Sequence, residues 1–166
     1  NTNTVINPIP VKYCKNIKLA NKLRKLCEDQ IKDETIGVKA GGTGIQALKK
    51  LKEKEPFTAK VFKKRLVKSG QNVKINQHTK GIEVEVYYFI KKSFFDFKGK
   101  ITKSNISKFI KFMGPCFEIV GFRQRNKKFT YLGDICGDFG FNIKFVVGRK
   151  TKFKKLNLNN LKTSLV

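Results

Sequence analysis

The sequence has few of the residues that most often build zinc sites. His78 is its single histidine, and its four cysteines, Cys14, Cys27, Cys116 and Cys136, are widely separated along 166 residues. No C-x-x-C pair occurs, so the spacing typical of a structural zinc site is missing. Reduced thiols in an intracellular compartment are the simplest interpretation, and nothing in the sequence favours a Cys–His nucleophile pair.

Long apolar runs are also missing. No stretch approaches the roughly 20 residues that cross a bilayer, and the polar N-terminus has no apolar segment of the kind found in signal peptides. We therefore predict a cytoplasmic protein with no membrane partner. With 40% hydrophobic residues and 15 phenylalanines, the chain still has enough apolar side chains for the core of one domain.

Acidic residues are scarce: 12 Asp and Glu stand against 37 Lys and Arg, which gives a net charge of +25. Such an excess repels itself in a compact chain and attracts polyanions, so RNA, DNA or an anionic surface is the default partner. The alternative is compositional drift, because Lys, Asn, Ile and Phe are abundant together, as in proteins from AT-rich genomes. Drift explains the lysines well and the shortage of acids less well, so both explanations stay open.

Three of the few acids lie inside two apolar, strand-like runs, at residues 81–90 and 115–120. Side chains alternate along a strand, so Glu83 and Glu85 lie on the same side of the first run. Desolvating such a pair costs several kcal/mol unless something compensates it. A Mg²⁺ ion is a suitable compensator, with Glu118 of the second run as a third oxygen ligand. The alternative is that Glu83 and Glu85 face solvent from a one-sided antiparallel sheet.

The apolar spacing predicts a mixed α+β fold with a dominant sheet. Residues 17–31 have the pattern of a basic amphipathic helix, and residues 45–54 that of a second helix. Residues 36–44 indicate a strand that runs into a glycine-rich turn, without the G-K-[ST] ending of a Walker loop. Ser104 is a suitable N-cap for a third helix, expected over residues 104–113 and stopped by a Gly-Pro pair. Residues 121–133 are expected to form a polar excursion.

Five segments occur in a specific order and spacing. Residues 36–43 read Ile-Gly-x-Lys-x-Gly-x-Thr, and residues 47–57 have the pattern of a helix followed by Glu-Pro. Residues 81–90 contain Gly-x-Glu-x-Glu, and residues 117–123 read Phe-Glu-Ile-Val-x-x-Arg. Residues 134–148 contain Asp-x-x-x-Asp followed by Phe-Val-x-Gly. Together they resemble the 2-keto-4-pentenoate hydratases and the related 4-oxalocrotonate decarboxylases of the fumarylacetoacetate hydrolase-like superfamily. The resemblance implies a twisted mixed β-sheet or barrel with flanking helices. It divides the chain into an N-terminal arm and basic helix (1–35) and a hydratase-like catalytic domain (36–166) that lacks the family's C-terminal strands.

The resemblance also implies a site and an activity. By position, Glu83, Glu85 and Glu118 would hold Mg²⁺ or Mn²⁺, Lys39 would transfer protons or bind a carboxylate, and Asp138 would support catalysis. The implied activity is that of a hydratase, a carbon–oxygen lyase of aromatic catabolism that acts on a small 2-keto or 2-hydroxydienoic acid. The cation stabilises the enolate charge of this substrate while a base activates water. Family members are expected to form homo-oligomers.

Some positions depart from the family pattern. Phe57 stands where many hydratases have an acid that assists water addition, and the bulky Phe139 and Phe141 stand where small residues are usual, so that their rings could fill the pocket. These departures and the charge support an alternative: a catalytically silent relative that serves as an RNA-associated structural subunit, in a ribosome-like assembly of an organellar matrix. The candidate RNA contacts are Lys49, Lys50, Lys63, Lys64, Arg65, Lys150, Lys152, Lys154 and Lys155.

Overall fold

The computed structural model describes residues 5–50, 52–125, 128–154 and 162. The helices are α1 (Val11–Cys14), α2 (Ile17–Asp29), α3 (Ile45–Lys50) and α4 (Leu132–Gly137). The strands are β1 (Thr35–Gly41), β2 (Phe57–Phe62), β3 (Leu66–Lys68), β4 (Thr79–Ile90), β5 (Ile110–Gly121), β6 (Asn142–Val147) and β7 (Thr151–Lys152). In this part of the chain, no helix is both long enough and apolar enough to cross a bilayer.

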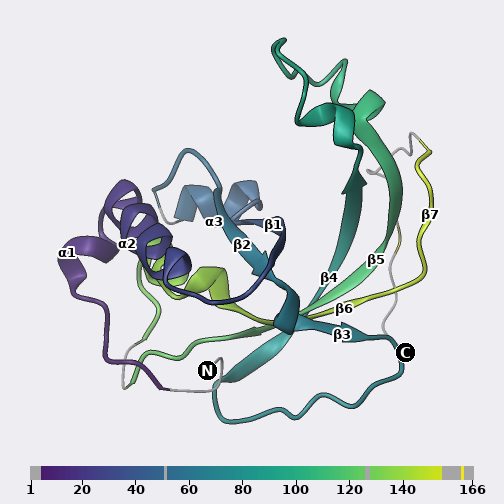
Figure 1. Ribbon diagram of the computed structural model, residues 1–166. Helices are drawn as coiled ribbons and strands as arrows, with labels where there is room; N and C mark the ends of the chain where they lie inside the picture. Colours follow the sequence, from purple (N-terminus) through teal and green to yellow (C-terminus); the bar gives the residue numbers. More distant parts are fainter. Residues whose placement is uncertain (1–4, 51, 126–127, 155–161, 163–166) are drawn as a thin grey trace.

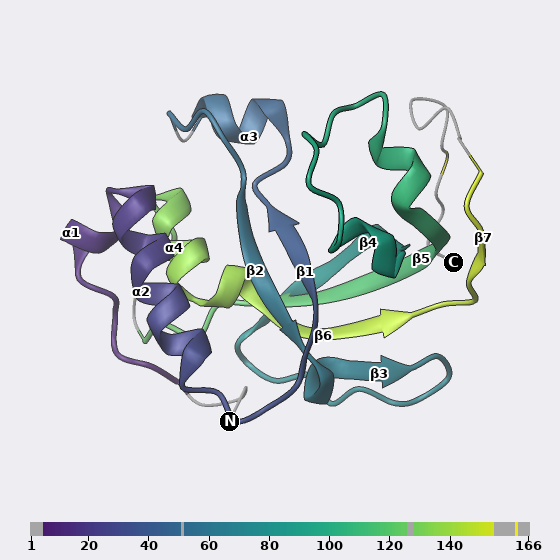
Figure 2. The same cartoon turned by 45° about the horizontal axis from the view of Figure 1, so that its top comes forward.

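The strands form two sheets, which confirms the predicted α+β class. β1 and β2 make an antiparallel pair, and the larger sheet has the order β3-β6-β5-β4. The long strands β4 and β5 are antiparallel over nearly their whole length, β6 pairs with the other edge of β5, and β7 pairs with β5 near Phe112. Figures 1 and 2 show α1, α2 and α4 gathered at one end of the molecule, beside the β1–β2 pair, with the curved β4–β5 ribbon at the other end.

The β1–β2 pair joins these two ends through two apolar clusters. Phe57 and Ala59 of β2 pack with Ala20 of α2, and with Leu132 and Cys136 of α4. Burying a side chain such as Phe57, which is 2% exposed, contributes about 1.5–3 kcal/mol. Further along β2, a second cluster connects this strand to one face of the larger sheet. Its buried members are Val61, Cys116 and Phe145.

Helix α2 lies where the apolar spacing predicted it. It begins after Asn16, whose side-chain oxygen accepts hydrogen bonds from the backbone N–H groups of Lys18 and Leu19 at 3.0 and 3.2 Å. This cap satisfies donors that the first helical turn leaves unpaired. The buried Glu28 near the end of the helix accepts the backbone N–H of Lys60 in β2 at 2.8 Å. The basic helix is thereby joined to the β1–β2 pair.

The helix predicted over residues 104–113 is wrong. Ile106–Phe109 form only a 3₁₀ turn, preceded by Asn105 rather than Ser104 at the cap position, and β5 begins at Ile110. Ile110 and Phe112 instead pair with β4, opposite Ile90 and Phe89. These β-branched and aromatic residues gain more from cross-strand packing than from a short isolated helix. The Gly-Pro pair that was expected to end a helix therefore lies inside the strand.

The polar excursion predicted over residues 121–133 is also wrong at both ends of this range. Phe122, Arg123 and Gln124 are buried, and α4 begins at Leu132. Gln124 is held by the backbone, since its side chain accepts the N–H of Ile9 at 2.8 Å and donates to the carbonyl of Asp134 at 3.1 Å. Polar side chains can be buried when the backbone satisfies them in this way. A polar composition was therefore a poor guide to exposure here.

Candidate metal centre

The register of the larger sheet brings the three predicted glutamates together. Glu83 of β4 lies directly opposite Glu118 of β5, and Glu85 lies opposite Cys116. Residues opposite each other in an antiparallel pair project from the same face. One carboxylate oxygen from each of Glu83, Glu85 and Glu118 lies within 4.8 Å of the other two. The sequence placed two of the three on a common side, and the pairing of β4 with β5 adds the third.

This face of the sheet is the one that the β1–β2 pair covers. Glu118 is only 1% exposed, whereas Glu83 and Glu85 are on the open side of the group. The aliphatic residues of the opposite face are the ones that lack cover, since Ile82 is 55% and Val84 44% exposed. Glu83 and Glu85 are exposed, as the alternative of a one-sided sheet expects, but the aliphatic residues Ile82 and Val84 of the other face are exposed as well rather than packed.

Lys39 of β1 reaches across to the buried glutamate. Its Nζ atom donates to both carboxylate oxygens of Glu118, at 2.5 and 2.6 Å, and to the carbonyl of Gly140 at 2.9 Å. These contacts engage all three protons of the ammonium group. The Lys39 side chain is 9% exposed, so a buried ion pair forms one wall of the site.

Burial sets the electrostatics of the carboxylates. It raises the pKa of Glu118 above its usual value, and the charge and hydrogen bonds of Lys39 only partly oppose this. Burial also raises the pKa of Glu85, with a smaller contribution from the charge of Glu83. Both directions follow mainly from desolvation, with a smaller contribution from like charges, because both effects disfavour the ionised form.

A left-handed turn presents the Gly140 carbonyl to Lys39. Phe139, Gly140 and Phe141 have φ angles of 52°, 68° and 67°. The left-handed conformation costs an L-residue about 1–2 kcal/mol, so a strained phenylalanine on each side of a glycine is unusual. The strain lies beside the candidate site, where it holds one backbone oxygen in position.

Asn142 is a site residue that sequence analysis missed. It is 1% exposed, and its amide nitrogen donates to Glu118 at 3.2 Å. Its side-chain oxygen accepts a hydrogen bond from Arg65 at 2.9 Å. The only local signal is an asparagine at the start of a strand, which does not reveal partners that lie far away in the sequence.

Asp138 lies next to the left-handed turn and outside the group of three glutamates. Its carboxylate accepts the backbone N–H and the Nε of Arg123, at 2.8 and 2.7 Å, and its backbone carbonyl accepts Nη2 at 2.8 Å. Asp138 is fully buried, and burial raises its pKa against the opposing effect of Arg123. In the structure this residue ties the turn to the end of β5.

The three phenylalanines that depart from the family pattern lie in three different surroundings. Phe57 is in the core beneath α2 and α4. The Phe141 ring packs edge-on against Phe122, with centroids 5.3 Å apart. The Phe139 ring contacts the guanidinium groups of Arg65 and Arg123, at 5.2 and 5.6 Å from its centroid. The ring contacts of Phe139 and Phe141 are therefore with residues other than the three glutamates.

The residues suggested for RNA contact are mostly at the surface. The exposed ones are Lys49, Lys63, Lys64, Lys150, Lys152 and Lys154. Lys155 and the side chain of Lys50 lie outside the described residues. Arg65 is the exception, because it is only 4% exposed and donates from Nη1 to the carbonyl and side-chain oxygens of Asn142. It does not belong to the exposed basic surface in which the sequence placed it.

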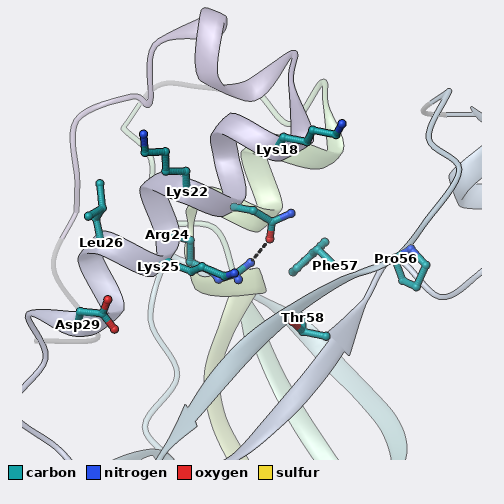
Figure 3. Close-up of a pocket in the computed structure, with 10 residues that line it drawn as sticks. Lys18, Lys22, Arg24, Lys25, Leu26, Asp29, Pro56, Phe57 and Thr58 are labelled. Atoms are coloured by element: carbon teal, nitrogen blue, oxygen red, sulfur yellow. Dashed lines mark hydrogen bonds between the residues drawn. The ribbon is translucent and has the colours of Figure 1, made fainter. Parts of the chain in front are cut away.

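A further row of lysines, not singled out from the sequence, lines a cavity of about 540 Å³ between α2 and the start of β2 (Figure 3). Lys18, Lys22 and Lys25 lie on one side of α2 because they are four and three residues apart. Arg24, at the base of the cavity, is buried and donates to Asn21 at 2.7 Å and to Glu28 at 3.1 Å. Asp29, the acid in the lining, pairs with Lys60 at 2.7 Å.

The donor set at the glutamates fits a hard divalent cation. Three carboxylates and the Lys39 ammonium leave a net formal charge of −2, which matches one divalent ion. Carboxylate oxygens are the protein ligands that Mg²⁺ prefers, and Mg²⁺ usually keeps several water or substrate ligands. The exposed side of Glu83 and Glu85 leaves room for these.

The sheet order, the packed β1–β2 pair and the flanking helices together define a fumarylacetoacetate hydrolase-like fold. Two solved structures of 4-oxalocrotonate decarboxylase from Pseudomonas putida G7 share it, each at 15% sequence identity. The complex with magnesium and adipate matches 93% of this chain with a TM-score of 0.68, and the complex with calcium and acetate matches 94% with a TM-score of 0.72. The chain spans about 60% of the length of these neighbours. No family model and no curated protein matches the sequence.

Proposed function

We propose that this protein is a divalent-metal-dependent lyase of the hydratase type, which acts on a small 2-keto or 2-hydroxydienoic acid with Mg²⁺ or Mn²⁺ as cofactor. The observation that carries the proposal is the convergence of Glu83, Glu85 and Glu118 on one another. The three carboxylates lie close enough to repel one another, Lys39 pairs with only one of them, and a divalent ion would balance the remaining negative charge.

The structural neighbours support the class of ligand. One is described with magnesium and adipate and the other with calcium and acetate. Each pairs a hard divalent cation with a small carboxylate, which is the combination that the glutamates and Lys39 are suited to bind. Identity of 15% leaves the reaction itself to experiment, and decarboxylation is the closest competitor of hydration.

Each residue has a distinct role in the proposed site. Glu83 and Glu85 bind on the open side, where substrate oxygens and water have access. Glu118 binds from the buried side, oriented by Lys39 and Asn142. The bound cation supplies electrophilic stabilisation for negative charge on substrate oxygens.

Lys39 is the residue proposed to move a proton or to bind the substrate carboxylate. Its ammonium group is held by Glu118 and by Gly140. A cation held by the glutamates would balance part of the charge of Glu118 and so weaken its attraction for Lys39. The ammonium group would then be available to bind a substrate carboxylate or to donate a proton. Glu118 and the Gly140 carbonyl hold Lys39 in position for either role.

The test is calorimetric titration of the protein with Mg²⁺ and with Mn²⁺, with and without oxalate as a mimic of a chelating 2-keto acid. We expect one strong site that oxalate tightens. Glu83→Gln and Glu85→Gln should each lower the affinity for the metal at least tenfold, because each variant removes a charged ligand. Glu55→Gln, an exposed change outside the site, is the matched control.

Turnover of 2-hydroxypenta-2,4-dienoate, followed by loss of its ultraviolet absorption, then tests the reaction. Hydration that depends on the metal and is lost in Lys39→Met supports the full proposal. Metal binding that is equal in the wild type and in Glu83→Gln would overturn the site assignment. Metal binding with decarboxylation in place of hydration would retain the site and replace the reaction type.

A second candidate function is polyanion binding, consistent with an RNA-associated structural subunit. The observation that favours it is the row of Lys18, Lys22 and Lys25, which form no ion pair within the described residues. Exposed, unpaired lysines on one face of a helix are suited to phosphate contact. This function does not need the glutamates and can be tested separately.

The test is binding of a short single-stranded RNA at increasing salt. Each phosphate contact contributes about 0.7 to the slope of log K against log salt for single strands. Changing Lys18, Lys22 and Lys25 together to Gln should reduce the slope by about 2 if all three lysines contact phosphate. The matched control changes the exposed Lys98, Lys100 and Lys103 to Gln. Equal slopes in both triple variants would rule out this surface.

A further inference from the structure

A second cavity, of about 560 Å³, has a lining distinct from the candidate metal centre. Neither Lys39 nor any of the three glutamates contributes to this lining. Its charged residues are the cations Lys32, Lys64, Arg65, Arg123 and Lys144 and the acids Asp33 and Asp138. The lining therefore carries a formal excess of three positive charges.

The two acids of this cavity already have partners. Asp138 is bound by the backbone N–H and side chain of Arg123. Asp33 accepts the backbone N–H groups of Glu34 and Lys64 at 2.9 and 3.0 Å. Neither acid forms an ion pair with Arg65 or with a lysine of the lining, within the part of the chain that the structure describes. The two acids of the lining therefore do not neutralise its excess of positive charge.

Arg65 is the central feature of the cavity. It is 4% exposed, and the hydrogen bonds of its guanidinium group run from Nη1 to the carbonyl and side-chain oxygens of Asn142, at 3.0 and 2.9 Å. Both acceptors are neutral. A buried guanidinium group without a carboxylate partner is costly unless an anion accompanies it.

Aromatic rings and a second arginine complete the surroundings of Arg65. The guanidinium carbon lies 5.6 Å from the centroid of Phe62 and 5.2 Å from that of Phe139. Arg123 lies over the same Phe139 ring at 5.6 Å. Burial, with a smaller contribution from Arg123, lowers the pKa of Arg65 to about 10. Arg65 therefore stays charged at neutral pH, and two guanidinium groups are held together on one ring.

We propose that this cavity binds a small oxyanion with two negative charges, a phosphate or a dicarboxylate, with Arg65 as its principal donor. The guanidinium fork matches the paired oxygens of both ligand types. Lys64 and Lys144 lie at the cavity wall as further cations. They are joined to each other, since the Lys144 ammonium group donates to the Lys64 carbonyl at 2.7 Å.

The experiment is calorimetric titration of the metal-free full chain with inorganic phosphate and, separately, with malonate, at constant ionic strength. Competition between the two shows whether they share the site, and the tighter one identifies the ligand class. We expect Arg65→Gln to weaken binding at least tenfold. Arg65→Lys should weaken binding less than Arg65→Gln does, because lysine keeps the positive charge and loses only the paired N–H donors of the guanidinium group. Lys144→Gln should weaken binding by about threefold, as expected for a single flanking charge.

The matched control is Lys98→Gln, which removes one exposed charge at a residue outside the cavity lining. Its affinity should equal that of the wild type. Equal affinities in the wild type, Lys144→Gln and Lys98→Gln would show that anions bind the basic surface at large and would overturn the proposal. No saturable binding of either anion to folded wild-type protein would overturn it as well. If Arg65→Gln is unfolded by circular dichroism, Arg65→Lys and Lys144→Gln carry the test.

Discussion

At the scale of single residues, Lys39 is where the candidate metal centre and the stability of the fold meet. Lys39→Met leaves the buried Glu118 without its counter-charge. Breaking a buried ion pair on one side costs about 3–5 kcal/mol, because the remaining charge is unpaired. We therefore expect a large loss in the free energy of unfolding, measured with urea, and partial recovery when Mg²⁺ is added.

The matched control for this prediction is Lys63→Met. It breaks the Lys63–Glu34 pair, in which both side chains are more than half exposed, so the expected loss is below about 1 kcal/mol. Similar losses in the two variants would contradict the assignment of Lys39 as the counter-charge of a buried carboxylate. The double variant Lys39→Met with Glu118→Gln should recover part of the lost stability, since it removes both charges.

The cysteines give a second prediction at this scale, which concerns their reactivity at pH 8. Burial raises the pKa of Cys116 and of Cys136 to about 11, so on the order of 0.1% of either thiol is ionised at pH 8. Cys14 is fully buried, whereas Cys27 is exposed. In the folded protein we expect a chromogenic disulfide reagent to label one thiol, Cys27, at pH 8. The other thiols should react only after addition of denaturant, and rapid labelling of more than one thiol would contradict the packing of α4 and β5.

At the scale of elements, the turn between α4 and β6 determines the geometry of the site. Gly140 has φ of 68°, and a Cβ atom there would lie 3.0 Å from the Phe57 ring and 3.4 Å from Ala59. Gly140→Ala should therefore destabilise the protein by about 1–2 kcal/mol or more, through backbone strain and crowding. The Gly140 carbonyl also binds Lys39, so the same variant should weaken Mg²⁺ binding.

Gly37→Ala in β1 is the matched control for the turn. A Cβ atom at Gly37 has no neighbour within 4 Å, and this residue does not have a positive φ. Its replacement should leave stability within about 1 kcal/mol of the wild type. Chemical denaturation of both variants, with Mg²⁺ titrations of each, measures the difference. If Gly140→Ala and Gly37→Ala had the same stability and the same affinity for Mg²⁺, the turn would not be what positions Lys39.

At the scale of the whole molecule, the net charge of +25 is the dominant property. Self-repulsion destabilises a compact chain, and salt screens it with a Debye length of about 10 Å at 0.1 M. We expect the melting temperature to rise when NaCl is increased from about 0.02 to 0.5 M, a range over which the Debye length falls severalfold. Differential scanning calorimetry with added sucrose as an uncharged control measures this. A melting temperature that falls with salt would show that attractive ion pairs outweigh the repulsion.

The elements that could be predicted from the sequence are those with a strong local signal. The apolar spacing of residues 17–31 indicates a helix, and the glycine-rich end of β1 indicates a turn. The same spacing gave a wrong helix over residues 104–113. The contacts that place Ile110 in a strand are with β4, whose residues lie far away in the sequence. Local propensity is a weak guide wherever tertiary pairing competes with it.

For the candidate site, the position of Glu83 and Glu85 on one side of a strand follows from local sequence, because a period of two is a property of the extended backbone. The charge of the whole molecule follows from composition alone. The tertiary fold is what places Glu118 beside this pair, joins Lys39 to Glu118 and buries Arg65 beside Arg123. These contacts depend on strand register and on the packing of the β1–β2 pair. Both are set by the summed burial of residues far apart in the chain, which no local pattern contains.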